Sequence, residues 1–160
     1  MKAEFRRAIL PDELKRLIAF DHKTFIKADW FTKSDWLQYE SYWMIVNGDT
    51  VGCCGFEHHV DFREDHEIEN PSLRGSLYIS TTGILPRFQG QGFGRLLKSW
   101  QIAYARRHRF CRIVTNHRAS NRQMIELNKK VGFRIIRQRK AIYYEDPDEP
   151  TVVMELKISK

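Results

Sequence analysis

Apolar residues in the first half of the chain recur at a spacing of two in some segments and of three to four in others. The first spacing is typical of strands with one buried face, and the second of amphipathic helices. Pro11 fits the first position of a helix, and Asn47-Gly48-Asp49 is a hairpin turn signal. The predicted order is strand 3–9, a helix from Pro11, a short helix with loops within 24–39, strand 42–46 and strand 50–62.

The second half continues the alternation after a polar stretch, residues 63–75, that predicts a loop. Strand 77–85 comes first, followed by a helix with the apolar face Phe93, Leu96, Leu97, Trp100 and Tyr104. Strand 112–115, a helix capped by Ser120 or Asn121 and ending at Val131, and strand 133–137 continuing through Tyr143 come next. In the last predicted strand Val152, Met154, Leu156 and Ile158 alternate with polar or exposed neighbours. Gly132 is the expected helix stop. Together these segments predict an α/β or α+β fold, a mixed sheet of about seven strands with helices on its faces.

The length of 160 residues fits one domain over residues 1–160. The net charge of +7 favours a polyanionic ligand, such as nucleic acid or a phosphorylated cofactor, or only a solubilising surface. No apolar run is long enough to span a membrane, and the charged opening residues do not fit a signal peptide. The three cysteines, Cys53, Cys54 and Cys111, contain no C-x-x-C pair, which favours a cytoplasmic location over a disulfide scaffold.

A glycine-rich segment, Gln89-Gly90-Gln91-Gly92-Phe93-Gly94, separates strand 77–85 from the next helix. Glycine lets the backbone approach a ligand closely, and the first amides of a helix lack intrahelical partners at the positive end of its dipole. A pyrophosphate therefore fits this loop, although a turn that only packs a helix on a strand is the alternative. The glycines follow neither the Walker pattern nor the dinucleotide pattern.

The same segment resembles the Q/R-x-x-G-x-G/A signature of the GNAT superfamily of N-acetyltransferases. Residues 78–86, Y-I-S-T-T-G-I-L-P, resemble the central strand of that family, and residues 118–133 resemble its second motif, S-N-x-x-A-x-x-L-Y-x-K-x-G-F. The resemblance implies a mixed, mostly antiparallel seven-stranded sheet flanked by about four helices. It also implies an enzyme that transfers acetyl from acetyl-CoA to a primary amine.

The resemblance further implies which residues hold acetyl-CoA as co-substrate. In such enzymes the loop amides bind the pyrophosphate, the strand before the loop meets pantetheine and the acetyl carbonyl, and the second motif contacts the pantetheine arm. The implied residues are Gln89, Gly90, Gln91, Gly92, Phe93, Gly94 and Arg95 in the loop, Thr82, Gly83 and Ile84 in the strand, and Asn121 and Asn128 in the second motif. The amine attacks the thioester directly, so Cys53 and Cys54 are interpreted as small core residues rather than nucleophiles.

The proton donor is left open by the sequence. Many family members have a tyrosine as donor where this chain has Asn128, and asparagine cannot donate a proton in that way. Asn128 either bonds near the cofactor sulfur or satisfies a backbone group, because an inward asparagine needs a partner. Tyr143 and Tyr144 are the alternative donors, although core and edge packing also explains them.

The proton acceptor is the second open question. An amine of the lysine type needs a base more than an α-amine does, because its pKa is about 10.4 rather than about 7.7–8.0. Glu57 is the candidate base; it shares a strand face with His59, whereas His58 points to the other face. Solvated charges at the end of a strand are the alternative interpretation. A metal site from His58, His59 and His66 is not expected, because their spacing matches no closed site.

Two classes of function therefore compete for this sequence. One is an N-acetyltransferase acting on a small molecule or a protein N-terminus, and the other is a non-catalytic acyl-CoA sensor with the same fold. A nucleic-acid partner is disfavoured because the basic residues are scattered, no membrane partner is expected, and a homodimer stays open. Acceptor specificity is expected in segments 24–39, 63–75 and 145–150.

Overall fold

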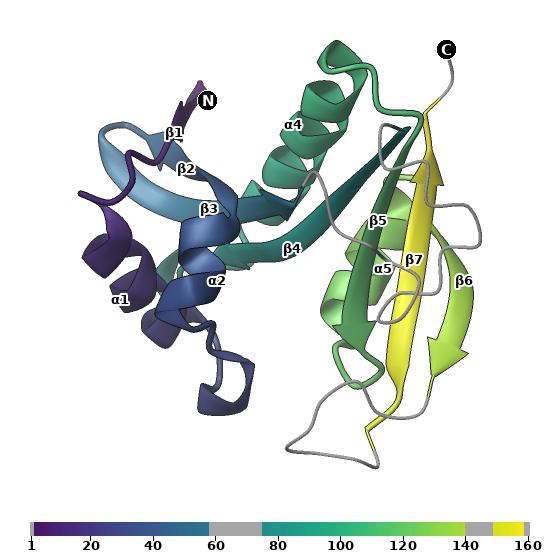
Figure 1. Cartoon of the computed structure of the whole chain (residues 1–160). Coiled ribbons are helices and arrows are strands. Elements are labelled where there is room, and N and C mark those ends of the chain that lie inside the picture. The colour runs from purple at the N-terminus through teal and green to yellow at the C-terminus, as the bar shows by residue number, and fades with distance from the viewer. Residues whose placement is uncertain (1, 58–74, 140–148, 159–160) are drawn as a thin grey trace. The chain divides into compact units, whose positions relative to one another are not determined.

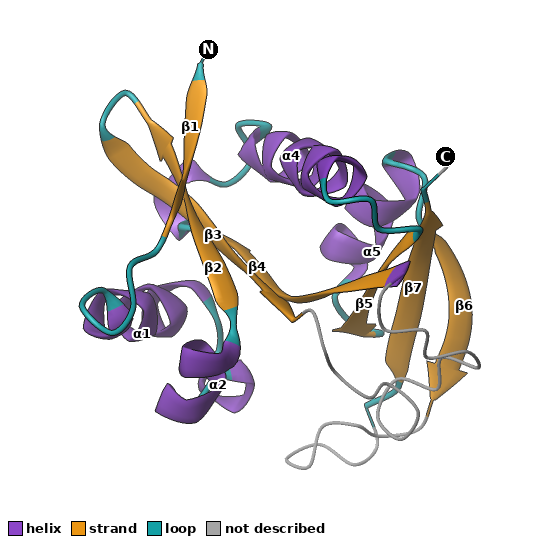
Figure 2. Ribbon diagram, turned by 45° about the horizontal axis from the view of Figure 1, so that its top comes forward, coloured by secondary structure: helices purple, strands orange, loops and turns teal. Residues whose placement is uncertain are grey.

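The computed structural model describes residues 2–57, 75–139 and 149–158 (Figure 1). The strands are β1 (Ala3–Arg7), β2 (Glu40–Val46), β3 (Asp49–Glu57), β4 (Ser76–Ile84), β5 (Arg112–Arg118), β6 (Arg134–Arg139) and β7 (Thr151–Lys157). The α-helices are α1 (Leu14–Thr24), α2 (Lys33–Gln38), α4 (Phe93–Arg107) and α5 (Arg122–Lys130), and two short 3-10 helices cover Lys27–Asp29 and Pro86–Phe88 (Figure 2).

The seven strands form a sheet in the order β1-β2-β3-β4-β5-β7-β6. Antiparallel pairs join β1 to β2, β2 to β3, β5 to β7 and β6 to β7, whereas β4 and β5 are parallel. The mixed, mostly antiparallel sheet with α-helices confirms the predicted fold class.

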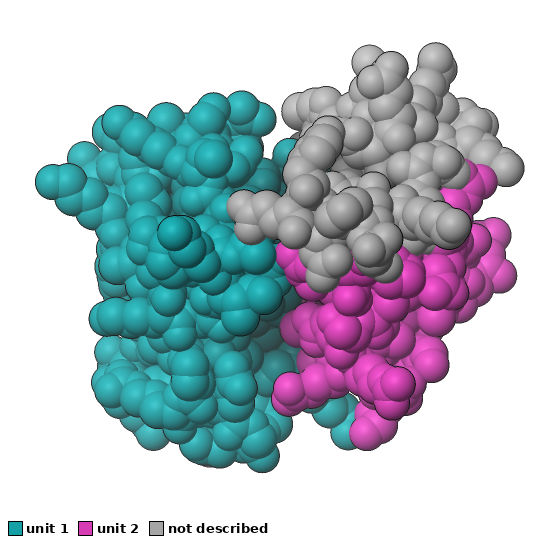
Figure 3. Space-filling view, turned by 90° about the horizontal axis from the view of Figure 1, so that it is seen from below, with its two compact units in different colours: residues 1–57, 79–97 teal, residues 58–78, 98–160 magenta. Residues whose placement is uncertain are grey.

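The chain divides into two compact units, which Figure 3 colours separately. Unit 1 contains residues 1–57 and 79–97, and unit 2 contains residues 58–78 and 98–160. Strand β4 and helix α4 each contribute residues to both units, so each unit is built from segments distant in the sequence.

A carboxylate holds α1 against β1 in unit 1. Glu13 accepts two hydrogen bonds from the Arg6 guanidinium, at 2.9 and 2.8 Å, and a third from the Ile9 N–H at 3.0 Å. The hydrogen bonds from Arg6 are the main reason that the pKa of Glu13 falls to about 2. Behind this contact Phe20 of α1 meets Trp43 of β2 edge to face, with ring centroids 5.7 Å apart. The helix is therefore anchored by charge at its start and by aromatic packing in its second half.

The core of unit 2 lies between α5 and strands β5 and β7. Ile113, Val114, Val153 and Met154 are each 0% exposed. Gly132, with φ of +100°, follows α5 as the predicted stop, because only glycine adopts that backbone conformation without strain.

The predicted hairpin between β2 and β3 is confirmed, since Asn47 and Gly48 have φ of +51° and +84°. The prediction that Pro11 opens α1 is wrong, because the helix begins at Leu14 after a turn.

Two predicted apolar patterns are wrong in detail. In α4, Leu96 is 37% exposed, and the inward face includes Lys98 and Gln101, both 0% exposed. In β7 two of the residues between the predicted apolar positions are buried, since Val153 is 0% and Glu155 5% exposed, whereas Lys157 is exposed. From Thr151 to Glu155 the side chains on both faces of this strand are therefore covered. The prediction from strand periodicity assumed that one face of the strand is exposed to solvent, and it was therefore wrong there.

Asp21, near the end of α1, is a fully buried carboxylate. Its Oδ2 accepts a hydrogen bond from the Phe31 N–H at 2.9 Å, which ties α1 to the segment before α2. Burial raises the pKa of this carboxyl from 3.8 to about 6, although the Phe31 hydrogen bond opposes the rise. Keeping Asp21 charged at neutral pH therefore lowers the free energy of unfolding.

We expect the wild-type protein to lose stability relative to the Asp21→Asn variant as the pH rises from about 4 to about 6. In that window the folded state keeps the Asp21 proton while the unfolded chain has lost it, so a higher pH favours unfolding. Denaturant titrations of both proteins at several pH values measure the difference in free energy of unfolding. The exposed Asp12→Asn change is the control, with no such trend. A pH-independent difference between wild type and Asp21→Asn contradicts the assignment.

Candidate functional site

The end of β4 carries the residues expected to meet pantetheine. Strand β4 pairs with β5 at Ser76, Leu77 and Tyr78, and residues 79–84 continue past these pairs within unit 1. Beyond the strand, the Leu85 N–H donates to the Val51 carbonyl at 3.0 Å, which keeps the chain against β3. The predicted set Thr82, Gly83 and Ile84 lies on this continuation.

Two glycines allow this stretch of β4 to be packed tightly. A Cβ at Gly52 of β3 would lie 2.7 Å from the Gly83 carbonyl oxygen. A Cβ at Gly83 would lie 2.8 Å from Thr24 Cγ2, 2.9 Å from Phe25 Cζ and 3.1 Å from Phe20 Cε1. Real Cβ atoms do not tolerate such contacts, so both positions require glycine for close approach rather than for an unusual φ.

The glycine-rich loop follows the 3-10 turn Pro86–Phe88. Gly90 and Gly92 have φ of +77° and +85°, and a Cβ at either position would meet nothing within 4 Å. Gln89 Nε2 donates to the Ile84 carbonyl at 3.0 Å, and Gln91 Nε2 donates to the Arg87 carbonyl at 3.1 Å. The two glutamine side chains therefore brace the loop, while its glycines set the backbone path.

The loop leads directly into the N-terminus of α4. The Leu96 N–H donates to the Gly92 carbonyl at 3.2 Å, so the amides of Phe93, Gly94 and Arg95 precede the first closed turn. Arg87 and Arg95 are exposed, and the Arg87 guanidinium lies 4.7 Å from the centroid of the Phe88 ring. Amides, helix dipole and guanidinium charges all favour an anion here, which is the arrangement expected for a pyrophosphate site.

Glu57, the candidate base, lies at the end of β3 and is bound by β4. Ser80 Oγ donates to Glu57 Oε2 at 2.5 Å, a distance typical of a hydroxyl on a carboxylate. Tyr39 lies in the same cluster: burial and the Glu57 charge raise the pKa of its phenol, and a hydrogen bond with Ser80 opposes the rise. Sequence reasoning found Glu57 but missed Ser80 and Tyr39, because their proximity depends on how α2 and β4 pack.

The two asparagines of the second motif lie in unit 2. Asn121 is the N-cap of α5, and its Oδ1 accepts from the Met124 N–H at 3.2 Å. Asn128 is 0% exposed; its Nδ2 lies 2.7 Å from His117 Nε2 and 3.7 Å from Met154 Sδ. The inward face of α5 is thus centred on Ile125 and Asn128, whereas Met124, Leu127 and Val131 are only partly buried.

His117 is the partner of Asn128 that the sequence did not reveal. Burial, together with the charge of Lys98, lowers the pKa of His117 to about 3. The ring is therefore neutral at physiological pH, and its Nε2 can accept the hydrogen bond from Asn128. This neutral pair, of a buried Asn128 and a partly buried His117, joins β5 to α5.

The remaining candidate residues either lie in the core or fall outside the described residues. Cys53 and Cys54 are 1% and 0% exposed, and burial raises the pKa of Cys53, which fits core residues better than nucleophiles. Tyr143 and Tyr144 lie outside the described residues. So do His58, His59 and His66. Within the three described ranges, no group of three or more metal-ligating side chains occurs, and no helix combines the length and apolar character needed to cross a bilayer.

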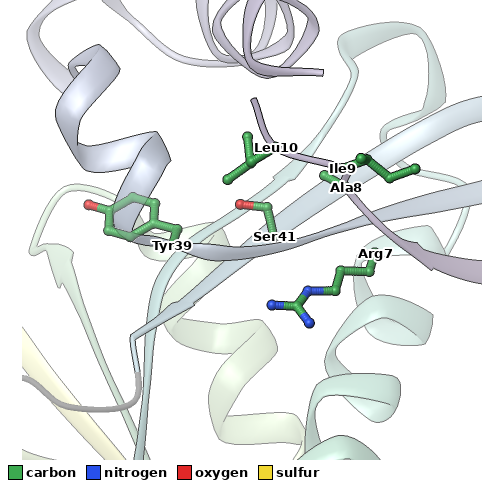
Figure 4. Close-up of a pocket in the computed structure, with 6 residues that line it drawn as sticks. All are labelled: Arg7, Ala8, Ile9, Leu10, Tyr39 and Ser41. Carbon is green, nitrogen blue, oxygen red and sulfur yellow. The ribbon is translucent and has the colours of Figure 1, made fainter. Parts of the chain in front are cut away.

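A pocket of about 340 Å³ lies in unit 1 at the end of β1 (Figure 4). Its lining residues are Arg7, Ala8, Ile9, Leu10, Tyr39 and Ser41. Ser41 is 2% exposed, and in the part of the chain that is described its Oγ has no hydrogen-bond partner. Arg7 pairs with Tyr42, so its side chain leaves the sheet on the face opposite to Ser41. The two polar groups therefore do not converge on one ligand.

Solved structures with the same fold extend over the whole chain. The ribosomal-protein-S18-alanine N-acetyltransferase of Escherichia coli is 18% identical with a TM-score of 0.79, over 99% of this chain and 96% of its own. Ard1 of Thermoplasma volcanium is 15% identical with a TM-score of 0.77, over 100% of both chains. The yncA protein of Salmonella typhimurium, solved with its cofactor acetyl-CoA, is 18% identical with a TM-score of 0.75, over 100% of this chain and 96% of its own.

A comparison with curated proteins gives no match. The sequence profile of the Acetyltransferase (GNAT) family matches residues 10–133, which include β4, the glycine-rich loop and the second motif. This chain belongs to the GNAT family of acetyltransferases.

Proposed function

We propose that this protein transfers the acetyl group of acetyl-CoA to a primary amine, on a small molecule or a protein N-terminus, by direct attack of the amine on the thioester. The observation that carries the proposal is the start of α4, where the amides of Phe93, Gly94 and Arg95 precede the first closed turn directly after the glycine-rich loop. Family membership supports the same donor, and the structurally similar E. coli protein is an N-acetyltransferase of alanine in ribosomal protein S18.

Most parts of the donor have a proposed partner in unit 1. The amides of Phe93, Gly94 and Arg95, with Gln89, Gly90, Gln91 and Gly92 before them in the chain, bind the pyrophosphate. Thr82, Gly83 and Ile84 present backbone groups to pantetheine and the acetyl carbonyl. The proposal assigns Asn121 a contact with the pantetheine arm. Asn128 has a structural role instead, because its amide is already engaged with His117 inside unit 2.

Glu57 is the proposed proton acceptor for the attacking amine. The hydrogen bond from Ser80 fixes the position of this carboxylate, so binding of a substrate need not first restrict its rotation. Tyr143 or Tyr144 is the proposed donor to the departing thiolate. We further propose that residues 1–160 act as a single acetyltransferase domain in the cytoplasm, without a metal. A direct measurement of the protein's mass in solution tests whether the active form is a homodimer.

One observation favours the alternative function, a non-catalytic acyl-CoA sensor. No tyrosine occupies the position of Asn128, so acid catalysis from that helix is absent. Incubation with acetyl-CoA and a panel of amines, followed by free thiol release and mass detection, separates the two functions. Acetyl-CoA binding without release by any amine favours the sensor.

We expect the Gly92→Glu variant to lose binding of CoA without unfolding. A carboxylate at the loop repels the pyrophosphate, and the positive φ of Gly92 adds a strain of about 1–2 kcal/mol. Gly48→Glu is the matched control, because Gly48 has φ of +84° and equally open surroundings in the distant β2–β3 turn. Calorimetric titration with CoA and thermal unfolding are measured on both variants. Equal CoA affinity in the two variants would show that the loop is only a turn.

We expect the Glu57→Gln variant to lose activity in a way that depends on pH and on the amine. At pH 7 a lysine-type amine should react about 100-fold more slowly, and the deficit should shrink as the pH approaches the pKa of the amine, because the amine is then neutral without help. The rate of reaction with an α-amine should fall by a smaller factor. The exposed Glu126→Gln is the control. A loss that is independent of both pH and amine contradicts a role as base.

A further inference from the structure

The pocket at the end of β1 contains a buried hydroxyl that no described group bonds. Ser41 lines this pocket of about 340 Å³ and is 2% exposed, and within the described residues its Oγ makes no hydrogen bond. Figure 4 shows the hydroxyl turned toward the side chains of Leu10 and Tyr39. Buried hydroxyls are almost always paired with protein, water or a ligand. The pocket therefore offers a hydrogen-bonding group to a molecule that enters it.

The other lining groups near Ser41 are apolar. Residues 8–10 contribute three aliphatic side chains, and Tyr39 contributes its ring. The hydroxyl of Tyr39 points away from Ser41 in Figure 4 and interacts with Ser80. The guanidinium of Arg7 lies on the opposite side of the strand. Of the six lining residues, none turns a charged group toward the Ser41 hydroxyl.

Backbone contacts hold these walls in place. A Cβ at Gly55 would stand 3.2 Å from Tyr39 Cδ2 and 3.3 Å from Tyr39 Cβ, so the ring lies directly on β3. The Ala8 N–H donates to the Ser41 carbonyl at 2.9 Å, which fixes the opposite wall. Ile9 is 60% exposed, so the rim of the pocket reaches solvent. The site is thus formed before a ligand arrives, as small-molecule sites usually are.

We propose that this pocket binds a small, uncharged and mainly apolar molecule whose single hydroxyl group hydrogen-bonds to Ser41 Oγ. An apolar cavity of about 150 Å³ already takes benzene, so 340 Å³ admits a ring with a substituent. An ion would lose its hydration here without gaining a countercharge. The same reason excludes CoA and a protonated amine, so the site is separate from those of the donor and the acceptor.

The test is a titration of ¹⁵N-labelled protein followed by NMR. Its probes are phenol and toluene, which have nearly the same shape and differ in the hydroxyl, and the charged compounds benzoate and benzylammonium. Phenol should bind about three- to tenfold more tightly than toluene, as one neutral hydrogen bond predicts. Both should give saturable shifts at the amides of residues 8–10 and Ser41, and the charged compounds should give none there.

Two variants test the residues that make the site. Ser41→Ala should bind phenol and toluene equally, whereas Ser34→Ala, at an exposed serine, should keep the preference for phenol. Ile9→Trp should abolish the saturable shifts with both compounds, because the larger side chain fills the rim. Ile26→Trp, at a position 64% exposed, is the matched control and should leave them unchanged.

Three results would overturn the inference. They are the absence of saturable shifts with phenol in wild type, equal affinity of wild type for phenol and toluene, and a preference for phenol that survives in Ser41→Ala. Tighter binding of benzoate or benzylammonium than of phenol would also overturn it, because the ligand would then be charged. No titration contains CoA, so none of these results bears on the proposed acetyl transfer.

Discussion

The close approach of β3, β4 and α1 at Gly52 and Gly83 is the constraint on which the rest of unit 1 depends. At Gly52 the neighbour is a backbone oxygen, which cannot rotate away, and at Gly83 the neighbours are three side chains from one helix. Any side chain at either position would push β4 away from β3 or from α1. The position of the glycine-rich loop follows from that packing, because Gln89 is anchored to the carbonyl of Ile84 at the end of the same strand. The loop is thus placed by the strand as well as by its own glycines.

The proposed anion site combines backbone geometry with charge. Gly90 and Gly92 bend the chain through positive φ, and the helix then begins with amides that no carbonyl of the helix accepts from. Arg87 and Arg95 add long-range attraction for a polyanionic ligand, to which the net charge of +7 also contributes.

The sequence predicted those features that depend on local chemistry. The Asn47-Gly48 turn, the Gly132 stop and the Asn121 cap all follow from residues next to one another in the chain. It failed where burial depends on distant neighbours. Leu96 is exposed although it fits the helical stripe, and Thr151 is buried although it alternates with apolar residues. The contacts of Glu57 with Ser80 and of Asn128 with His117 join residues 23 and 11 positions apart, and no periodic pattern encodes such pairs.

The engagement of Asn128 changes what the chemistry must supply. A tyrosine at this position would place a phenol near the end of α5, whereas the Nδ2 of Asn128 lies against a neutral, partly buried His117. The group that leaves in acetyl transfer from CoA is a thiolate, and a thiol with a pKa of about 8.5 departs near neutral pH without a strong acid. The attacking amine faces the larger barrier, since it must lose its proton before it can react. An amine of high pKa therefore needs a proton acceptor, for which Glu57, held by Ser80, is the proposed group, more than it needs the tyrosine that Asn128 replaces.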